Sequence, residues 1–383
     1  MIEQILAYFR FDVIEIIGIS LFFFLFIIQL FYYFRYYKKP YSTAKKRDKD
    51  GFYTTEKPKV SVIIVSENEV DSLKENLPFI LQQDYPDYEV IVVNNGSTDE
   101  SDELLRSIEL KDKKLYHTGL PYSNDWKLDR RKLALTIGIK AAKSDILLFT
   151  EPYCKPVSDK WIESMLRELD PERDVVLGYS FFKPARQFFS RVARFDNLLF
   201  SMQYLSQVIR HKPYTGNYRN LLFRKHLFFD NKGFASLLRV ANGEELFISR
   251  IMTRDNTSVA LSHDSFVETN LDDFSLWRQI KRSYFAIRSY LKSSATVFKF
   301  EIFSRSIFYM LFIALIIYSV ILQNWVLLGI AVFLFLIRLI TQLVIINKDA
   351  RYFMSGKFYF SLIVLDIIQP LYNIRFKSWR KRR

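Results

Sequence analysis

The 383-residue sequence contains a single cysteine, Cys154. One cysteine excludes an intrachain disulfide framework and a zinc site built from cysteines of this chain. The histidines are few and scattered, and they never stand at the spacing of paired metal ligands (His117, His211, His226 and His263). The sequence also has no internal repeat and no low-complexity run. These absences leave a chain whose fold depends on an apolar core.

The composition is aromatic and basic, with 17% aromatic residues and a formal net charge of +14. An aromatic excess fits a membrane protein with aromatic side chains at the interface. A basic balance allows nucleic acid, anionic lipid or an acidic substrate as the partner. Many of the basic residues flank apolar segments, which favours the membrane surface, and we recognise no DNA- or RNA-binding module. We therefore expect membrane lipids, and no nucleic acid, as partners.

An apolar run over residues 13–34 is long enough to span a bilayer. Its positive charges follow the run, whereas a cleaved signal peptide carries them before a shorter run. The positive-inside rule places those charges in the cytoplasm. We expect an uncleaved transmembrane anchor over residues 1–36, a basic linker over 37–58 and a cytoplasmic domain over 59–300.

Two further apolar runs near the C-terminus predict a transmembrane helical hairpin over residues 301–347. Arg338 interrupts the second run, so its side chain should face protein or snorkel to the interface. The next apolar stretch is shorter and contains Asp366. Spanning there would place the basic tail outside the cell, against the charge rule. We expect an interfacial or re-entrant segment over residues 348–383.

The domain between these segments begins with the pattern of an α/β sheet. Residues 60–65 and 89–93 are apolar and rich in β-branched residues, as buried parallel strands are. A helical pattern separates them, and the two capping boxes that begin at Ser72 and Ser97 predict two helix starts. This alternation requires a right-handed parallel crossover, and ligands of such sheets bind beyond the carboxyl ends of the strands.

The sequence of these strands and loops resembles that of family-2 glycosyltransferases of the GT-A type. The matching segments are VSVII at 60–64, NE at 68–69, QDYP at 83–86, EVIVV at 89–93 and GSTD at 96–99. The resemblance implies an α/β domain with a mixed, mostly parallel sheet and a site for a nucleotide-sugar donor. The donor-binding residues that it implies are Ser66, Asn68, Glu69, Asn95, Ser97, Lys127 and Arg131. The last two belong to a basic helix start that opposes the helix macrodipole, so we expect a compensating partner there.

Two signature positions depart from the family pattern. Asn95 replaces the second aspartate of the pair that reads the base, and an amide offers both an acceptor and a donor, so the base stays open. At the family's D-x-D metal site stand Glu151 and Tyr153. A glutamate still ligates a divalent ion, but a phenol with a pKa of about 10 is a poor substitute for a carboxylate. The resemblance thus implies a weakened Mg²⁺ or Mn²⁺ site.

The acid pair Glu244 and Glu245 precedes an apolar helix pattern, which a plain helix N-terminus also explains. In the family this pair is the catalytic signature, and we align Glu245 with the general base. An exposed glutamate is ionised at neutral pH, as a base must be. The resemblance further implies acceptor-binding roles, although Ser283 replaces the family's aromatic residue after the last of them (Arg219, Asn220, Gln279 and Arg282).

These observations favour a membrane-bound inverting glycosyltransferase of the cytoplasmic membrane. It would be multi-pass, with its catalytic domain in the cytoplasm and a lipid-linked or cell-envelope glycan as acceptor. The alternative is a degenerate transferase that serves as a binding or scaffold subunit in envelope-glycan assembly, because three signature positions changed together (Asn95, Tyr153 and Ser283).

Overall fold

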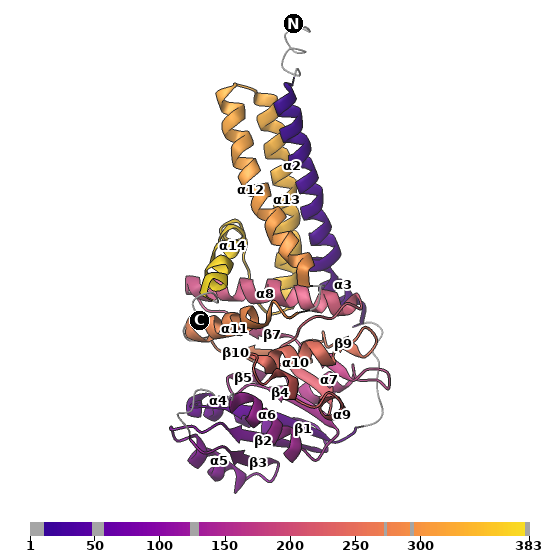
Figure 1. The fold of residues 1–383 in the computed structure, drawn as a ribbon, viewed down its shortest axis with the longest axis vertical. Coiled ribbons are helices and arrows are strands. Elements are labelled where there is room, and N and C mark those ends of the chain that lie inside the picture. Colours follow the sequence, from indigo (N-terminus) through magenta and orange to yellow (C-terminus); the bar gives the residue numbers. More distant parts are fainter. Residues whose placement is uncertain (1–10, 48–56, 123–129, 272–273, 292–294, 380–383) are drawn as a thin grey trace. The chain divides into compact units, whose positions relative to one another are not determined.

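The computed structural model describes residues 11–47, 57–122, 130–271, 274–291 and 295–379, and these form two compact units (Figure 1). We call Ser42–Ser294 with Phe353–Ser355 the α/β unit. We call Met1–Tyr41 with Ala295–Tyr352 and Gly356–Arg383 the helical unit. Each is described by itself.

Within the described residues, the α/β unit contains a seven-stranded sheet of order β3-β2-β1-β4-β8-β6-β9. β2 and β4 pair parallel to β1, β3 pairs parallel to β2, and β9 pairs parallel to β6, whereas β8 is antiparallel to β4 and β6. This confirms the predicted mixed, mostly parallel sheet. The strands are β1 (Val60–Ser66), β2 (Tyr88–Asn94), β3 (Leu115–Gly119), β4 (Ile146–Thr150), β6 (Val175–Leu177), β8 (Leu221–Arg224) and β9 (Thr257–Val259).

A smaller sheet follows the end of β4, in the order β5-β10-β7. It pairs β10 (Val267–Thr269) antiparallel to β5 (Cys154–Pro156) and parallel to β7 (Ser180–Phe182). The lone cysteine therefore lies in a strand, where Cys154 is fully buried and its sulfur lies 3.2 Å from the Thr269 hydroxyl.

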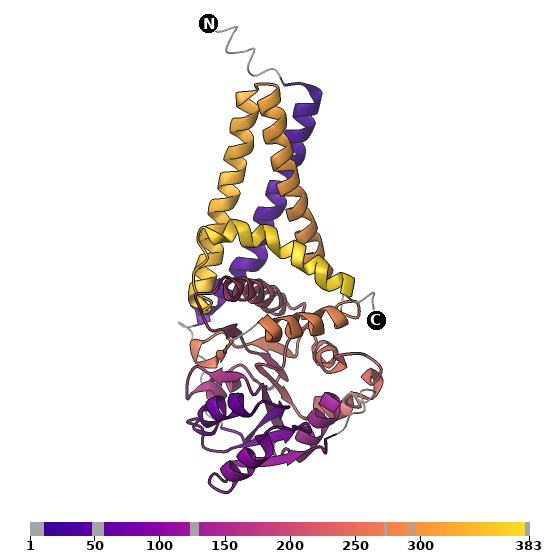
Figure 2. The same ribbon diagram turned by 90° about the vertical axis from the view of Figure 1, so that its left-hand side faces the viewer.

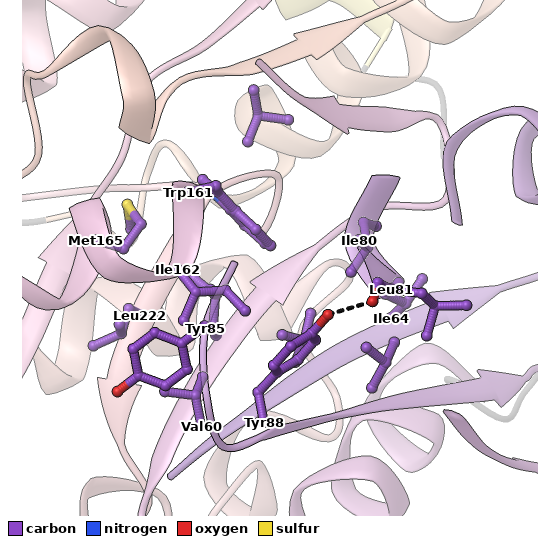
Figure 3. Close-up of a cluster of buried hydrophobic side chains, with 14 of the residues drawn as sticks. Val60, Ile64, Ile80, Leu81, Tyr85, Tyr88, Trp161, Ile162, Met165 and Leu222 are labelled. Carbon is purple, nitrogen blue, oxygen red and sulfur yellow. Dashed lines mark hydrogen bonds between the residues drawn. The ribbon is translucent and has the colours of Figure 1, made fainter. Parts of the chain in front are cut away.

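Helices cover both faces of the main sheet, so its central strands are apolar throughout. One face packs against α4 (Val70–Leu81), α5 (Ser101–Glu109) and α7 (Trp161–Leu166), and Figure 3 shows side chains of α4 and α7 near those of β1 and β2. The other face packs against α6 (Arg130–Ala141), which approaches closely at Gly138. A Cβ added there would lie 2.8 Å from Ile63 Cγ2, closer than van der Waals contact allows.

Both predicted capping boxes are wrong, because the serines serve other hydrogen bonds. α4 begins directly after Glu69, whose carboxylate accepts the Ser72 hydroxyl at 2.6 Å. α5 begins after Glu100, not after Ser97. The Ser97 hydroxyl instead accepts the Asn68 N–H at 2.9 Å, which ties together the loops that follow β1 and β2.

A buried acid, Asp196, joins two further helices of the α/β unit. Asp196 accepts hydrogen bonds from Trp277 Nε1 at 3.2 Å and from Lys281 Nζ at 2.9 Å, so two helices are joined by a buried ion pair. These helices are α8 (Phe188–Ile209) and α11 (Phe274–Ile287). The remaining helices are α9 (His226–Asp230), α10 (Gly243–Ile251), and the short turns η2 (Ala235–Leu237) and η3 (His263–Ser265).

The helical unit contains, among the described residues, three helical segments that are long and apolar enough to cross a membrane (Val13–Arg47, Thr296–Ile321 and Trp325–Tyr352). α2 (Val13–Tyr32), α12 (Thr296–Ile321) and α13 (Trp325–Tyr352) lie side by side (Figure 2), and the first segment continues through η1 (Tyr33–Tyr37) into α3 (Lys38–Arg47). α14 (Ser361–Trp379) is not one of the three, and it runs across the others in Figure 2.

The prediction that Arg338 faces protein is confirmed. Its side chain is fully buried, and Arg338 Nη2 lies 2.8 Å from Asp366 Oδ2 on α14. Arg305 on α12 donates to the other oxygen of the same carboxylate at 2.6 Å. One acid thus holds two buried cations, as buried charges within an apolar helix bundle require.

Candidate active site

A cavity of about 210 Å³ lies at the carboxyl ends of β1, β2 and β4, where ligands of parallel sheets bind. Its walls come from the loops after these strands, from the start of α6, from the chain before β8, and from α10 and α11. The structure thereby brings together many residues that the sequence predicted (Glu69, Asn95, Arg131, Glu151, Tyr153, Arg219, Glu244, Glu245 and Gln279).

The end of β2 presents a hydrogen-bond acceptor to the cavity wall. Asn95 Nδ2 donates to Glu67 Oε2 at 2.6 Å, which fixes the orientation of the amide. Asn95 Oδ1 is buried and has no partner among the described residues. Glu67 is a site residue that the sequence analysis missed, and only its position directly after β1 signalled it.

The basic start of α6 has the compensating partner that the macrodipole argument predicts. Arg131 Nη2 donates to Glu151 Oε1, and Arg131 Nε lies 3.7 Å from Glu244 Oε1. Burial lowers the pKa of Arg131, but the carboxylates of Glu151 and Glu244 outweigh this and raise the pKa above its usual value. Arg131 is therefore a fixed cation that joins β4 to the acid pair of α10.

Glu245 differs from the exposed, ionised glutamate that the sequence predicts. Its side chain is half-buried in the cavity wall, and burial raises the pKa of Glu245 to about 8. The negative charges of Glu244 and Glu151 contribute to this raised pKa, whereas Arg131 and Arg219 oppose it. Glu245 therefore holds a proton at neutral pH.

Tyr153 keeps its proton as well. Burial and the nearby Glu151 raise the pKa of Tyr153 well above its usual value, and the opposing effect of Arg131 and Arg219 is smaller. A protonated phenol gives a divalent cation no charge, and both buried carboxylates of the cavity, Glu151 and Glu244, face the Arg131 guanidinium. Among the described residues no three His, Cys, Asp or Glu gather as metal ligands. The predicted metal site therefore lacks a fitting set of donors.

Arg219 is a buried cation that pairs with no carboxylate of the described residues. Its Nη2 donates to Asn197 Oδ1 at 2.8 Å, and its guanidinium lies 5.3 Å from the centre of the Phe182 ring. Its Nη1 is buried and has no partner within the described part of the chain. The side chain lines the cavity, as the acceptor-site prediction requires of its position.

Other predicted site residues lie outside the lining of this cavity. Asn220 does not line the cavity, because its amide donates to the Tyr179 and Ser265 carbonyls and accepts from Trp161 Nε1, so it is a structural residue. Arg282 does not line the cavity either, although Gln279 of the same helix does. The strand-end residues Ser66, Asn68 and Ser97 lie outside its lining, and the latter two tie the loops together. Lys127 lies outside the described residues.

A missed contact joins the acid pair to α11. Asn242 lies two residues before Glu244, and its side-chain amide donates to the Ser283 hydroxyl at 3.1 Å. Asn242 adopts a left-handed backbone conformation with φ of 55°, which asparagine tolerates better than most residues. The serine at the family's aromatic position therefore has a defined partner in this chain.

Residues 61–246 match the model of the glycosyl transferase family 2. Among solved structures, the chain is similar to the mannosyltransferase PcManGT from Pyrobaculum calidifontis in complex with GDP-Man and Mn²⁺, with 18% identity, a TM-score of 0.56, and coverage of 96% of this chain and 100% of that one. It is also similar to residues 1–349 of S. aureus TarS, with 16% identity, a TM-score of 0.41, and coverage of 60% and 63%.

No curated protein matches the sequence. At 18% identity, the likeness to the mannosyltransferase concerns the fold. That fold agrees with the mixed α/β sheet and with the family match, which begins in β1 and ends within α10 after the acid pair. Residues 61–246 therefore form a domain that matches glycosyl transferase family 2 and has the GT-A type of α/β fold.

Proposed function

We propose that this chain is a membrane-bound inverting glycosyltransferase. It moves a sugar from a nucleotide-diphosphate donor to a hydroxyl group of a lipid-linked or cell-envelope glycan. One observation carries the proposal: the acid pair of α10 lines the same cavity as Arg131 and as Asn95, which follows β2. A base and a donor site within one cavity are what a transfer between two bound substrates needs.

The nucleotide part of the donor binds at the ends of β1 and β2. Asn95 Oδ1 accepts a hydrogen from the base, because Glu67 holds the amide with its oxygen free. Glu69 lines the cavity beside it. The structurally similar mannosyltransferase was solved with GDP-Man, which supports a nucleotide sugar as the donor class.

Transfer with inversion needs a base on the acceptor side of the sugar. Glu245, in its ionised form, takes the proton of the acceptor hydroxyl. At the same time the oxygen of that hydroxyl forms a bond to the anomeric carbon of the sugar. The bond from that carbon to the diphosphate breaks, and the nucleoside diphosphate leaves with the electron pair. Glu244, 3.7 Å from Arg131 Nε, is held in place and orients the reacting groups instead of accepting the proton.

The apolar helices of the helical unit support a location of this chemistry at a membrane. With three helices of sufficient length and apolarity, the charge rule puts the N-terminus outside and the α/β unit in the cytoplasm. α12 and α13 then form a hairpin that returns to the cytoplasm, and α14 lies in the interface. A multi-pass protein of the cytoplasmic membrane meets lipid-linked acceptors where its donor, a cytoplasmic metabolite, is also available.

Tyr153 at the metal position favours the second candidate, a binding subunit that has lost turnover. The two candidates differ in one property. The transferase releases nucleoside diphosphate when donor and acceptor are both present, whereas the binding subunit retains the donor unchanged.

A calorimetric titration of the full chain in detergent with a panel of nucleotide sugars tests the proposal, with and without Mn²⁺. We expect at least one nucleotide sugar to bind, and a membrane extract that supplies the acceptor to cause release of its nucleoside diphosphate. Absence of binding to every nucleotide sugar under both conditions would refute it.

A further inference from the structure

We propose that Arg219, together with Arg131, supplies the positive charge that the donor's diphosphate requires, so that the donor binds without a divalent cation. This rests on the proposed nucleotide-diphosphate donor. It follows from three features of the cavity: an uncompensated arginine, a tyrosine where a carboxylate would bind metal, and an arginine already seated on the remaining carboxylate.

The first feature is the charge of Arg219. No carboxylate lies within ion-pair distance of its guanidinium in the described chain, and its Nη2 donates to the neutral amide of Asn197. The residue is only 3% exposed, so water does not compensate the charge. A buried cation without a counter-ion is costly, which indicates that an anionic ligand completes the site.

The second and third features, the tyrosine at the metal position and the arginine on the remaining carboxylate, concern the charge that a metal ion would meet. Two carboxylates and a divalent cation sum to zero charge. Here the Arg131 guanidinium is paired with Glu151 and lies 3.7 Å from the second buried carboxylate, Glu244, and a tyrosine phenol carries no charge at neutral pH. Arg131 therefore occupies both buried carboxylates where an ion would bind, and Arg219, which no carboxylate of the described chain contacts, is the cation left to meet the diphosphate.

Arg219 is held where a diphosphate would meet it. Its backbone carbonyl accepts the hydroxyl of Thr150 at 3.1 Å, and Thr150 ends β4 directly before Glu151. Asn197 and the Phe182 ring fix the guanidinium from the other side. Its unused Nη1 and the partly exposed Arg131 are two donors of the kind that bind phosphate oxygens in pairs.

The test uses the full chain in detergent and measures binding of GDP and UDP by calorimetry, once with EDTA and once with Mn²⁺. We expect the tighter of the two to have the same Kd in both buffers, within about threefold. Binding that needs Mn²⁺ would overturn the inference and leave the proposed function standing. Binding of neither nucleotide in either buffer would refute both.

Variants of Arg219 test whether this residue supplies the positive charge to the bound diphosphate. Arg219→Met should weaken binding of the nucleoside diphosphate about 10- to 100-fold in EDTA, the range for a lost hydrogen bond to a charged group, and Arg219→Lys should restore part of it. Arg224→Met is the matched control, because Arg224 is paired with Asp174 and does not line the cavity. Equal affinity of Arg219→Met and wild type would contradict the inference.

A second variant tests the same inference and leaves the buried Arg219 in place. Tyr153→Asp adds a carboxylate to the cavity that Glu151 and the two arginines line, so its charge should cancel that of Arg219. We expect weaker binding in EDTA and recovery with Mn²⁺, a metal dependence that the wild type lacks. Wild-type affinity of this variant in EDTA would overturn the inference, and thermal unfolding of each variant shows whether it is folded.

Discussion

Asn95 donates its side-chain amide to the carboxylate of Glu67, with 2.6 Å between Nδ2 and Oε2. The pairing links the ends of two adjacent parallel strands, β1 and β2. It also decides which end of the amide is available, because an acid accepts only from the nitrogen and leaves the oxygen for a ligand. The asparagine that replaces the family's aspartate thus still has an acceptor oxygen without a partner among the described residues.

We expect Asn95→Leu to weaken binding of the nucleoside diphosphate about tenfold, the value of one hydrogen bond to the base plus the loss of the Glu67 contact. The affinity for inorganic pyrophosphate, which has no base, should change little. Calorimetry with both ligands measures the difference. Equal losses for the two ligands would show that Asn95 acts on the phosphates or on the fold.

The pH dependence of transfer should rise toward alkaline pH. The pKa of Glu245 is raised to about 8 by burial and by Glu244 and Glu151, against the effect of Arg131 and Arg219. Below this pKa the base is protonated and inactive, so kcat/KM should fall about tenfold for each pH unit below 8 and level off above it. A profile that is flat between pH 6 and 8 would contradict this assignment of the base.

The proposed topology predicts which side of the membrane each segment faces. Cys154 is buried, so a cysteine introduced at the exposed Gln323 between α12 and α13 gives a labelling signal with little background. A membrane-impermeant maleimide should label Gln323→Cys in intact cells. It should not label Ser107→Cys in the α/β unit until the cells are opened. The reverse pattern would invert the proposed orientation.

The close approach of α6 to the sheet predicts a stability effect. A methyl group at Gly138 meets Ile63 and Val93 on neighbouring strands, at 2.8 and 3.2 Å from their Cγ2 atoms. Gly138→Ala should therefore lower the free energy of unfolding by about 1–3 kcal/mol, despite the better helix propensity of alanine. Lys140→Ala, at an exposed position of the same helix, is the control and should change it by less than about 0.5 kcal/mol.

The strands, the α/β class and the acid pair were predictable, because they depend on local periodicity and on residues adjacent in sequence. The helix starts at Ser72 and Ser97 were not. Their hydroxyls bond to Glu69 and to the Asn68 backbone, and such local competition with capping leaves no trace in the pattern. The structural role of Asn220 depends on partners far away in sequence, so its motif suggested a ligand contact instead.

The electrostatics of the site were also beyond the sequence. That Arg131 faces Glu151 and Glu244 follows from the meeting of α6, β4 and α10, and it explains basic residues at a helix start. The raised pKa of Glu245 follows from the same meeting of charges. Residue types near a motif indicate a site, whereas counter-ions and burial decide what each member of it does.

The most direct measurement compares transfer by the wild type and by Glu245→Gln, at a pH above 8, with donor binding measured on the same samples. Glutamine keeps the size of the side chain but takes up no proton. We expect donor affinity within about threefold of the wild type and a loss of turnover of about 100-fold or more. Wild-type turnover by Glu245→Gln would contradict the account, because the base would then lie elsewhere.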